Sequence, residues 1–292
     1  MLYDINLTIT YTYEVPASGG RHVVRVLPLS LPNRQRLVAG TVSFKPAPEE
    51  RSDSVDFFAN PATSIVFRSA HDKLVIRMQA RVQLDIQPLT ADFSPPLSDF
   101  PAEIANIWST APDSPHHFLG QSPLLPEDPL IAAYTLSIVK PGMTIRQIAT
   151  AICERIHRDF TYDPKATTVE TPPREAFKLK RGVCQDFTHV MITALRSLGI
   201  PAGYVSGFLR TIPPPGKERL EGADAMHAWV RFWCGRAEGW MELDPTNNIF
   251  AGADHIVVGH GRDYSDVAPV IGVLKSYGSH ETEQAVDVLP LG

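Results

Sequence analysis

The chain has 292 residues, which exceeds the usual length of a single domain and predicts two compact units, each with a core of its own. Hydrophobic residues make up 43% and charged residues 20% of the chain, a balance that excludes a disordered or fibrous protein. The net charge of -5 and the lack of a run of Lys and Arg exclude a nucleic-acid partner.

The first third of the chain has the pattern of an antiparallel β unit. Apolar and polar residues alternate over residues 2–14 and again over 74–86, which is the period of half-buried strands. Between them, turn residues separate shorter β-rich runs at 22–27, 37–44 and 64–67. We therefore expect an antiparallel β-sandwich.

The composition changes after residue 86, where nine prolines fall within 42 positions and interrupt every periodic pattern. We place a domain boundary near residue 98. The expected organisation is a β-rich domain over 1–98 and a second domain over 99–292.

The second domain begins with helical patterns. Thr144 and Gln147 form a Thr-x-x-Gln capping box ahead of isoleucines at helical spacing, and a short helix is predicted over 172–179. A third helix begins at Cys184, with apolar residues recurring at helical spacing from Phe187 to the stop at Gly199. Strand-like segments follow at 202–209, 226–233 and 239–243, with a loop rich in proline and glycine over 211–223.

The cysteines and the N-terminus lead to an expectation about location. Three cysteines, at 153, 184 and 234, are too few and too scattered for a disulfide framework, and no Cys-x-x-Cys or His-x-x-x-His spacing indicates a metal site. There is no signal-peptide pattern and no apolar run of about 18 residues. We expect a cytoplasmic protein without a membrane partner or a bound metal, in which Cys153 and Cys234 are structural.

Cys184 stands where a thiol can become reactive. A thiol attacks as its thiolate, and the free value near pKa 8.5 has to fall for use at neutral pH. Unpaired N–H groups and the positive end of the helix dipole favour the anion, and Gly182 lets a substrate approach the backbone. Asp186 in the same turn opposes this effect, so a cationic histidine has to outweigh it.

His227 and Asp244 supply that partner if the intervening hairpin is tight. A two-residue Gly235-Arg236 turn places His227 directly opposite Asp244 in the antiparallel register. Cross-strand Cβ atoms lie about 4.5 to 5.5 Å apart, close enough for a carboxylate to hold an imidazole N–H. Taken singly, Cys184, His227 and Asp244 are each more often structural; together they predict a nucleophile, its base and an orienting group.

Four blocks in this order resemble the transglutaminase-like superfamily, which shares a papain-like cysteine-protease core. They are Gly182-Val183-Cys184-Gln185-Asp186-Phe187, Gly199-Ile200-Pro201-Ala202 with Val205-Ser206-Gly207, His227-Ala228-Trp229-Val230, and Leu243-Asp244-Pro245-Thr246-Asn247. The N-terminal β unit resembles the extra domain of the bacterial branch. The resemblance implies an α+β fold in which a helix carrying Cys184 packs on an antiparallel sheet carrying His227 and Asp244. It also implies attack on an amide carbonyl through a thioester that water or an amine resolves.

The resemblance further implies how the oxyanion is stabilised. Tyr162 lies in an aromatic-x-Tyr element similar to that of bacterial members and is expected to act beside the backbone N–H of Cys184. Animal transglutaminases use a tryptophan in this role, but none lies between Trp108 and Trp229. Nothing resembles a calcium cage of clustered acidic residues either, so we expect no cofactor and favour hydrolysis over cross-linking.

Three further residues are expected to support the site. Asp186 shares the first turn with Cys184, and His189 lies about 140° round the same helix, too far to act as its base. Trp229 shares the strand parity of His227 and can stack on it or pack in the core.

We therefore predict a cytoplasmic bacterial cysteine amidase or peptidase that acts on a peptide or protein amide. Two alternatives stay open: acyl transfer to an amine, with water excluded by the loop over 211–223, and a non-enzymatic binding module that retains the fold. Substrate specificity is assigned to that loop and to the proline-rich segment, without a pattern that names a side chain. The oligomeric state is left open.

Overall fold

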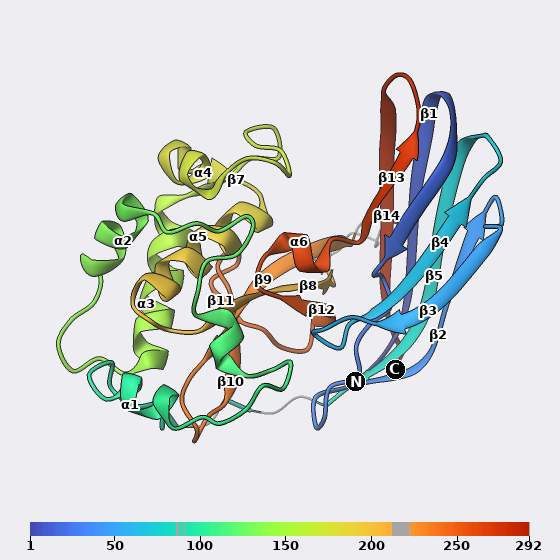
Figure 1. Cartoon of the computed structure of the whole chain (residues 1–292). Coiled ribbons are helices and arrows are strands. Elements are labelled where there is room, and N and C mark those ends of the chain that lie inside the picture. The colour runs from blue at the N-terminus through green and yellow to red at the C-terminus, as the bar shows by residue number, and fades with distance from the viewer. Residues whose placement is uncertain (86–87, 90, 212–221, 223, 292) are drawn as a thin grey trace, which may run out of the picture.

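The structure is a computed structural model that describes residues 1–85, 88–89, 91–211, 222 and 224–291. Most of the predicted specificity loop over 211–223 and the end of the predicted strand at residue 86 lie outside these residues. Figure 1 shows three parts: a group of helices, a five-stranded sheet in the middle and a tall curled sheet on which both chain ends lie. Among the described residues, no helix has the length and apolarity of a membrane span.

The curled sheet is built around one long strand, β1 (Leu2–Val24). The first half of β1 pairs with β5 (His71–Leu84) and β14 (His280–Leu291), and its second half pairs with β4 (Pro61–Phe67) and β13 (Val270–Lys275). The sheet is completed by β2 (Gln35–Lys45) beside β5 and β3 (Glu50–Val55) beside β4. All pairs are antiparallel, and the buried residues alternate along β1 as the pattern predicts. They share one core with Phe208, Ile256 and Val258 of the middle sheet.

The two C-terminal strands belong to this sheet. In β14, twelve consecutive residues pair with β1, although the chain from 99 onward was expected to form the second domain. The sheet thus takes strands from both predicted domains, 1–98 and 99–292. Only Val286 and Val288 of β14 are buried, so its sequence lacks the full alternation that marks β1.

The middle sheet has the strand order β11-β10-β9-β8-β12. Its strands are β8 (Ala202–Leu209), β9 (Ala225–Trp233), β10 (Trp240–Asp244), β11 (Ile249–Phe250) and β12 (His255–Gly261). A two-stranded parallel piece, β6 (Thr161–Tyr162) and β7 (Arg181–Gly182), leads into the helix that carries the cysteine. The sequence predicted β8, β9 and β10 but not β12.

The helices cover this sheet. They are α1 (Phe100–Ala105), α2 (Pro129–Leu136), α3 (Ile145–Asp159), α4 (Pro173–Leu179), α5 (Cys184–Ser197) and α6 (Tyr264–Val267), with a 3-10 turn at Pro115–Phe118. The predicted capping box of α3 is present, because the Thr144 hydroxyl accepts from the Gln147 N–H at 3.2 Å and the Gln147 side chain accepts from the Thr144 N–H at 3.1 Å. Buried residues of α3 and α5 form one core with β8, β9 and β10. The predicted α+β class, with a helix carrying Cys184 on an antiparallel sheet, is confirmed.

The curled sheet is joined to the middle sheet through β12, which lies at the end of its sheet. Gln35 donates to the carbonyl of Val257 at 2.7 Å and accepts from its N–H at 2.8 Å. Asn60 does the same for His260, both at 2.8 Å. Two amide side chains of the N-terminal unit therefore satisfy the edge of β12 where a neighbouring strand would otherwise pair.

Candidate active site

Cys184 is the first residue of α5 and is half-buried. The turn before it is held by Asp186, whose carboxylate accepts from the N–H of Val183 at 2.8 Å and from the Thr167 hydroxyl at 2.6 Å. A Cβ at Gly182 would lie 2.3 Å from this carboxylate, so only glycine fits there. Asp186 thus caps the helix that presents the thiol, and burial raises the pKa of its carboxyl.

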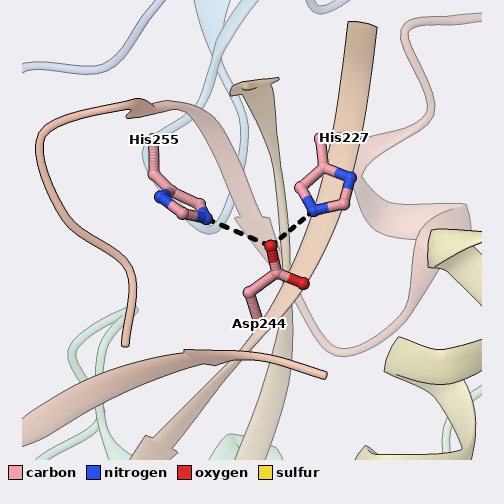
Figure 2. Close-up of side chains that lie close together, drawn as sticks. All are labelled: His227, Asp244 and His255. Atoms are coloured by element: carbon pink, nitrogen blue, oxygen red, sulfur yellow. Dashed lines mark hydrogen bonds and ion pairs between the residues drawn. The ribbon is translucent and has the colours of Figure 1, made fainter. Parts of the chain in front are cut away.

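His227 lies between Cys184 and Asp244. Its Nε2 is 2.7 Å from Oδ2 of Asp244, a carboxylate that is fully buried at the end of β10 (Figure 2). Burial by itself lowers the pKa of His227, but hydrogen bonds with Asp244 and Cys184 outweigh it and raise the pKa to about 10. Because Nε2 is taken by Asp244, Nδ1 is the ring nitrogen left for the thiol. A thiol, an imidazole and a carboxylate are thus joined in series.

The register of the hairpin differs from the predicted one. Leu243 pairs with Val230, which places Asp244 beside Trp229 rather than opposite His227. The prediction of a two-residue turn was wrong, because the connection is wider: the N–H of Cys234 bonds to the carbonyl of Gly239, and both Gly235 and Gly239 have positive φ. A shift of two residues keeps the side chains of His227 and Asp244 on the same face of the sheet, so the imidazole still reaches the carboxylate as a diagonal neighbour.

Asp244 accepts further hydrogen bonds from four donors. Oδ1 accepts from the N–H groups of Thr246 (2.9 Å) and Asn247 (3.2 Å), and Oδ2 accepts from the Asn247 amide (2.7 Å) and from Nε2 of His255 (3.2 Å). Burial raises the pKa of Asp244, but the hydrogen bonds, led by those of His227 and His255, lower it well below its ordinary range. The carboxylate is therefore ionised throughout the physiological range.

Trp229 packs on the other side of His227. The two rings stack at 6.1 Å with an interplanar angle of 30°. The indole N–H donates to Glu242 at 2.5 Å, and both oxygens of Glu242 are held by the guanidinium of Arg34, with one contact at 2.6 Å. Arg34 directly precedes β2, so the N-terminal unit contributes to the position of the tryptophan that stacks on His227.

Comparisons with known proteins agree with this geometry. The model of the transglutaminase-like superfamily core matches residues 132–245, and the model of the bacterial transglutaminase-like N-terminal region matches 3–83. The chain belongs to the transglutaminase-like superfamily. An uncharacterized protein of Mycobacterium tuberculosis is 35% identical over 262 residues, or 88% of this chain and 83% of its own length. One from Mycobacterium leprae is 30% identical over 96% of both chains.

Among solved structures, a proposed cysteine protease from Cytophaga hutchinsonii has the same fold. The alignment has a TM-score of 0.78 and 18% identity, and it covers all of this chain and 91% of that one. The curled sheet and the transglutaminase-like core therefore occur together in both proteins.

Two tyrosines lie near the thiol of this transglutaminase-like site. Tyr162 pairs with Gly182 across β6 and β7, and its side chain is 55% exposed. Burial and the charge of Cys184 raise the pKa of Tyr162, so its phenol is a neutral donor at neutral pH. Tyr204 on β8 is buried, and burial followed by the charge of Cys184 raises its pKa well above the ordinary value. The sequence analysis named Tyr162 as a candidate oxyanion donor. It did not single out Tyr204, because this residue carries no motif of its own.

The His189 ring packs against Tyr204 and lies at the start of α6. It is buried, accepts from the N–H of Tyr264 at 3.3 Å, and burial lowers its pKa to about 4. A neutral, buried imidazole of this kind supports α6 rather than exchanging protons with a substrate.

The other two cysteines are buried free thiols. Cys153 lies beneath the site, with its Sγ 3.6 Å from the backbone carbonyl of Asp244, and burial raises its pKa to about 12. Burial also raises the pKa of Cys234 far above its ordinary value. Neither thiol therefore ionises at neutral pH.

The same cluster contains groups of the kind that bind metals. Nitrogens of His227 and His255 and an oxygen of Asp244 all lie within 4.8 Å of one another. However, Nδ1 of His255 accepts from the N–H of Gly252 at 3.3 Å, so its proton sits on Nε2 and points to Asp244. A metal ion would have to displace that proton and the Nε2 proton of His227, whereas the hydrogen bonds account for all three groups as they stand.

Proposed function

We propose that the protein is a cysteine-dependent acyl-transfer enzyme that hydrolyses a peptide-like amide through a thioester intermediate. The supporting observation is the series of Cys184, His227 and Asp244, in which His227 contacts the other two groups and its pKa is raised to about 10. An imidazole of this kind is protonated at neutral pH and pairs with a thiolate. Such a pair is the activated form of a cysteine nucleophile.

The first half of the reaction forms the thioester. The Cys184 thiolate attacks the amide carbon, and the carbonyl oxygen becomes an oxyanion that accepts hydrogen bonds from the backbone N–H of Cys184 and the hydroxyl of Tyr162. Nδ1 of His227 then donates its proton to the leaving nitrogen, the carbon–nitrogen bond breaks, and an amine or ammonia departs.

The second half releases the acyl group. His227, now neutral, takes a proton from water, and the resulting hydroxide attacks the thioester carbon. The carbon–sulfur bond breaks to release the carboxylic acid, and the thiolate and imidazolium form again. Asp244 remains ionised throughout and stabilises the imidazolium in both halves. An amine in place of water would give the transferase reaction.

A screen with two variants tests this proposal. Wild-type protein, Cys184→Ala and the matched control Cys234→Ala are incubated with a library of peptides and small amides, with and without added primary amines. We expect release of ammonia or amine by wild type and Cys234→Ala and a loss of at least about 10⁴-fold in Cys184→Ala. Acid quenching followed by intact-mass measurement should detect an acyl group on Cys184.

The outcomes separate the alternatives. Incorporation of the added amine into the product in preference to water would show that the activity is acyl transfer to an amine and not hydrolysis. Absence of turnover and of any acyl adduct, together with a Cys184 thiol that alkylates like free cysteine, would leave the binding module as the function of the fold.

A further inference from the structure

We propose that His255 is a positioning residue of this site, a second imidazole that holds the Asp244 carboxylate on His227. The inference rests on the proposed function and adds to it a residue from β12, a strand outside the four matched sequence blocks. Figure 2 shows the two imidazoles approaching one oxygen of Asp244 from opposite sides.

Both nitrogens of His255 are engaged, and this sets its tautomer. Nδ1 accepts from the N–H of Gly252 at 3.3 Å, so the proton of the neutral ring is on Nε2, which donates to Oδ2 of Asp244 at 3.2 Å. His255 is buried, and its neutral N–H adds no competing positive charge. The full negative charge of Asp244 thus remains available to the imidazolium of His227.

His255 differs from the other donors to Asp244 in where it comes from. Thr246 and Asn247 belong to the turn that directly follows Asp244 and would move with it. His255 comes from β12, at the far end of the sheet from β10 and β11, and β12 is held by Gln35 of the N-terminal unit. Among the described donors besides His227, only His255 ties the carboxylate to a separate part of the fold.

The His255 ring also contacts Trp229, the tryptophan that stacks on His227. The ring centroids of His255 and Trp229 lie 5.1 Å apart with an interplanar angle of 80°, a T-shaped contact, and Trp229 in turn stacks on His227. His255 therefore touches both groups that determine the orientation of His227. Loss of its N–H would let the carboxylate turn toward Asn247 and weaken the partner of the imidazolium.

The test is the rate of alkylation of Cys184 by iodoacetamide between pH 4 and 10 in wild type, His255→Leu and His255→Gln. We expect His255→Leu to shift the acid limb of the profile upward by about one pH unit, a roughly 10-fold lower rate on that limb, as one lost hydrogen bond to a charged group implies. His255→Gln retains an N–H donor of similar reach and should stay within about 2-fold of wild type. The matched control His22→Leu removes a buried histidine of the curled sheet and should leave the profile unchanged.

A further variant covers the case in which His255→Leu does not fold. His255→Asn keeps an amide but shortens its reach, so its profile should shift upward where that of His255→Gln does not. If His255→Leu and His255→Asn lower the melting temperature but keep the wild-type alkylation profile, His255 is structural only and the inference fails. It also fails if His255→Gln and His255→Leu have the same alkylation profile. If wild type itself alkylates like free cysteine, the proposed function fails instead.

Discussion

The curled sheet and the middle sheet share an antiparallel architecture but bury different side chains. The inner face of the curled sheet is mainly apolar, with residues such as Ile5, Leu7 and Ile76 excluded from water. The middle sheet buries ionisable groups near the junction of the two units, namely His227, Arg231, Glu242, Asp244, His255 and His260. Burial of such groups costs stability unless each is paired, so their presence in one sheet sets the region of the candidate site apart from the curled sheet.

The difference separates two kinds of variant. Changes in the curled sheet should alter the free energy of unfolding and leave the reactivity of Cys184 unchanged, whereas changes in the buried polar groups of the middle sheet should alter that reactivity. Residues that bridge the two regions are exceptions: Gln35 and Asn60 hold β12, and Arg34 of the N-terminal unit binds Glu242.

The largest effect is expected for Asp244→Asn. The shape of the side chain is retained, but His227 loses the charge that raises its pKa, and hydrolysis should fall by about 10² to 10⁴-fold. The measurement is kcat on the substrate found in the screen. The matched control is Asp4→Asn, which removes a carboxylate paired with Arg81 on the curled sheet and should have no effect on kcat. Equal activity of Asp244→Asn and wild type would show that the Asp244 carboxylate has no role in the reaction.

Ile76→Ala should change stability alone. Ile76 is fully buried in β5, and truncation of such a side chain costs about 2 to 5 kcal/mol of unfolding free energy. Urea denaturation measures the loss, and the alkylation profile of Cys184 in the folded variant should match wild type. A changed profile would mean that the packing of the curled sheet influences the site, in addition to the residues that bridge it to the middle sheet.

Two buried histidines should give opposite dependences of stability on pH. The pKa of His227 is raised to about 10, so its contribution is present below its unfolded value near 6.5 and is lost as the pH rises toward 10. Burial lowers the pKa of His22, so the unfolded chain binds its proton more readily and stability is lost as the pH falls below about 6.5.

Denaturation curves at several pH values check this pair. His227→Gln should flatten the alkaline decline and leave the acid side as in wild type, and His22→Gln should do the reverse. Parallel curves for wild type and both variants would contradict the assigned protonation states.

The smallest effect is expected for Arg34→Met. Glu242 would lose its cation, and because Arg34 is partly exposed we expect a loss of about 1 kcal/mol in stability and a 2- to 3-fold slower alkylation of Cys184 at pH 6. Arg36→Met, which removes an exposed arginine two positions away, is the control. No change in alkylation would confine the role of Arg34 to stability.

The sequence predicted the parts of the site that have local patterns. The helix that begins at Cys184 follows from its apolar spacing, and β8 and β9 follow from their composition, because periodicity and capping are local properties. The register was missed by two residues because the wider connection over Gly235–Gly239, with a glycine at each end, resembles a tighter turn.

Long-range contacts were not accessible from these patterns. His255 begins a strand that carries no motif, and its bond to Asp244 depends on how β12 is placed. The bond between Arg34 and Glu242 joins residues 208 positions apart, and nothing in either segment indicates the other. Such pairs depend on the packing of whole units.

The central claim is that His227 keeps Cys184 as a thiolate, and the alkylation rate of Cys184 against pH in wild type and His227→Ala tests it most directly. The account predicts that wild type reacts at pH values where free cysteine does not, and that this reactivity disappears in His227→Ala. The same rise near pH 8.5 in both proteins would contradict it.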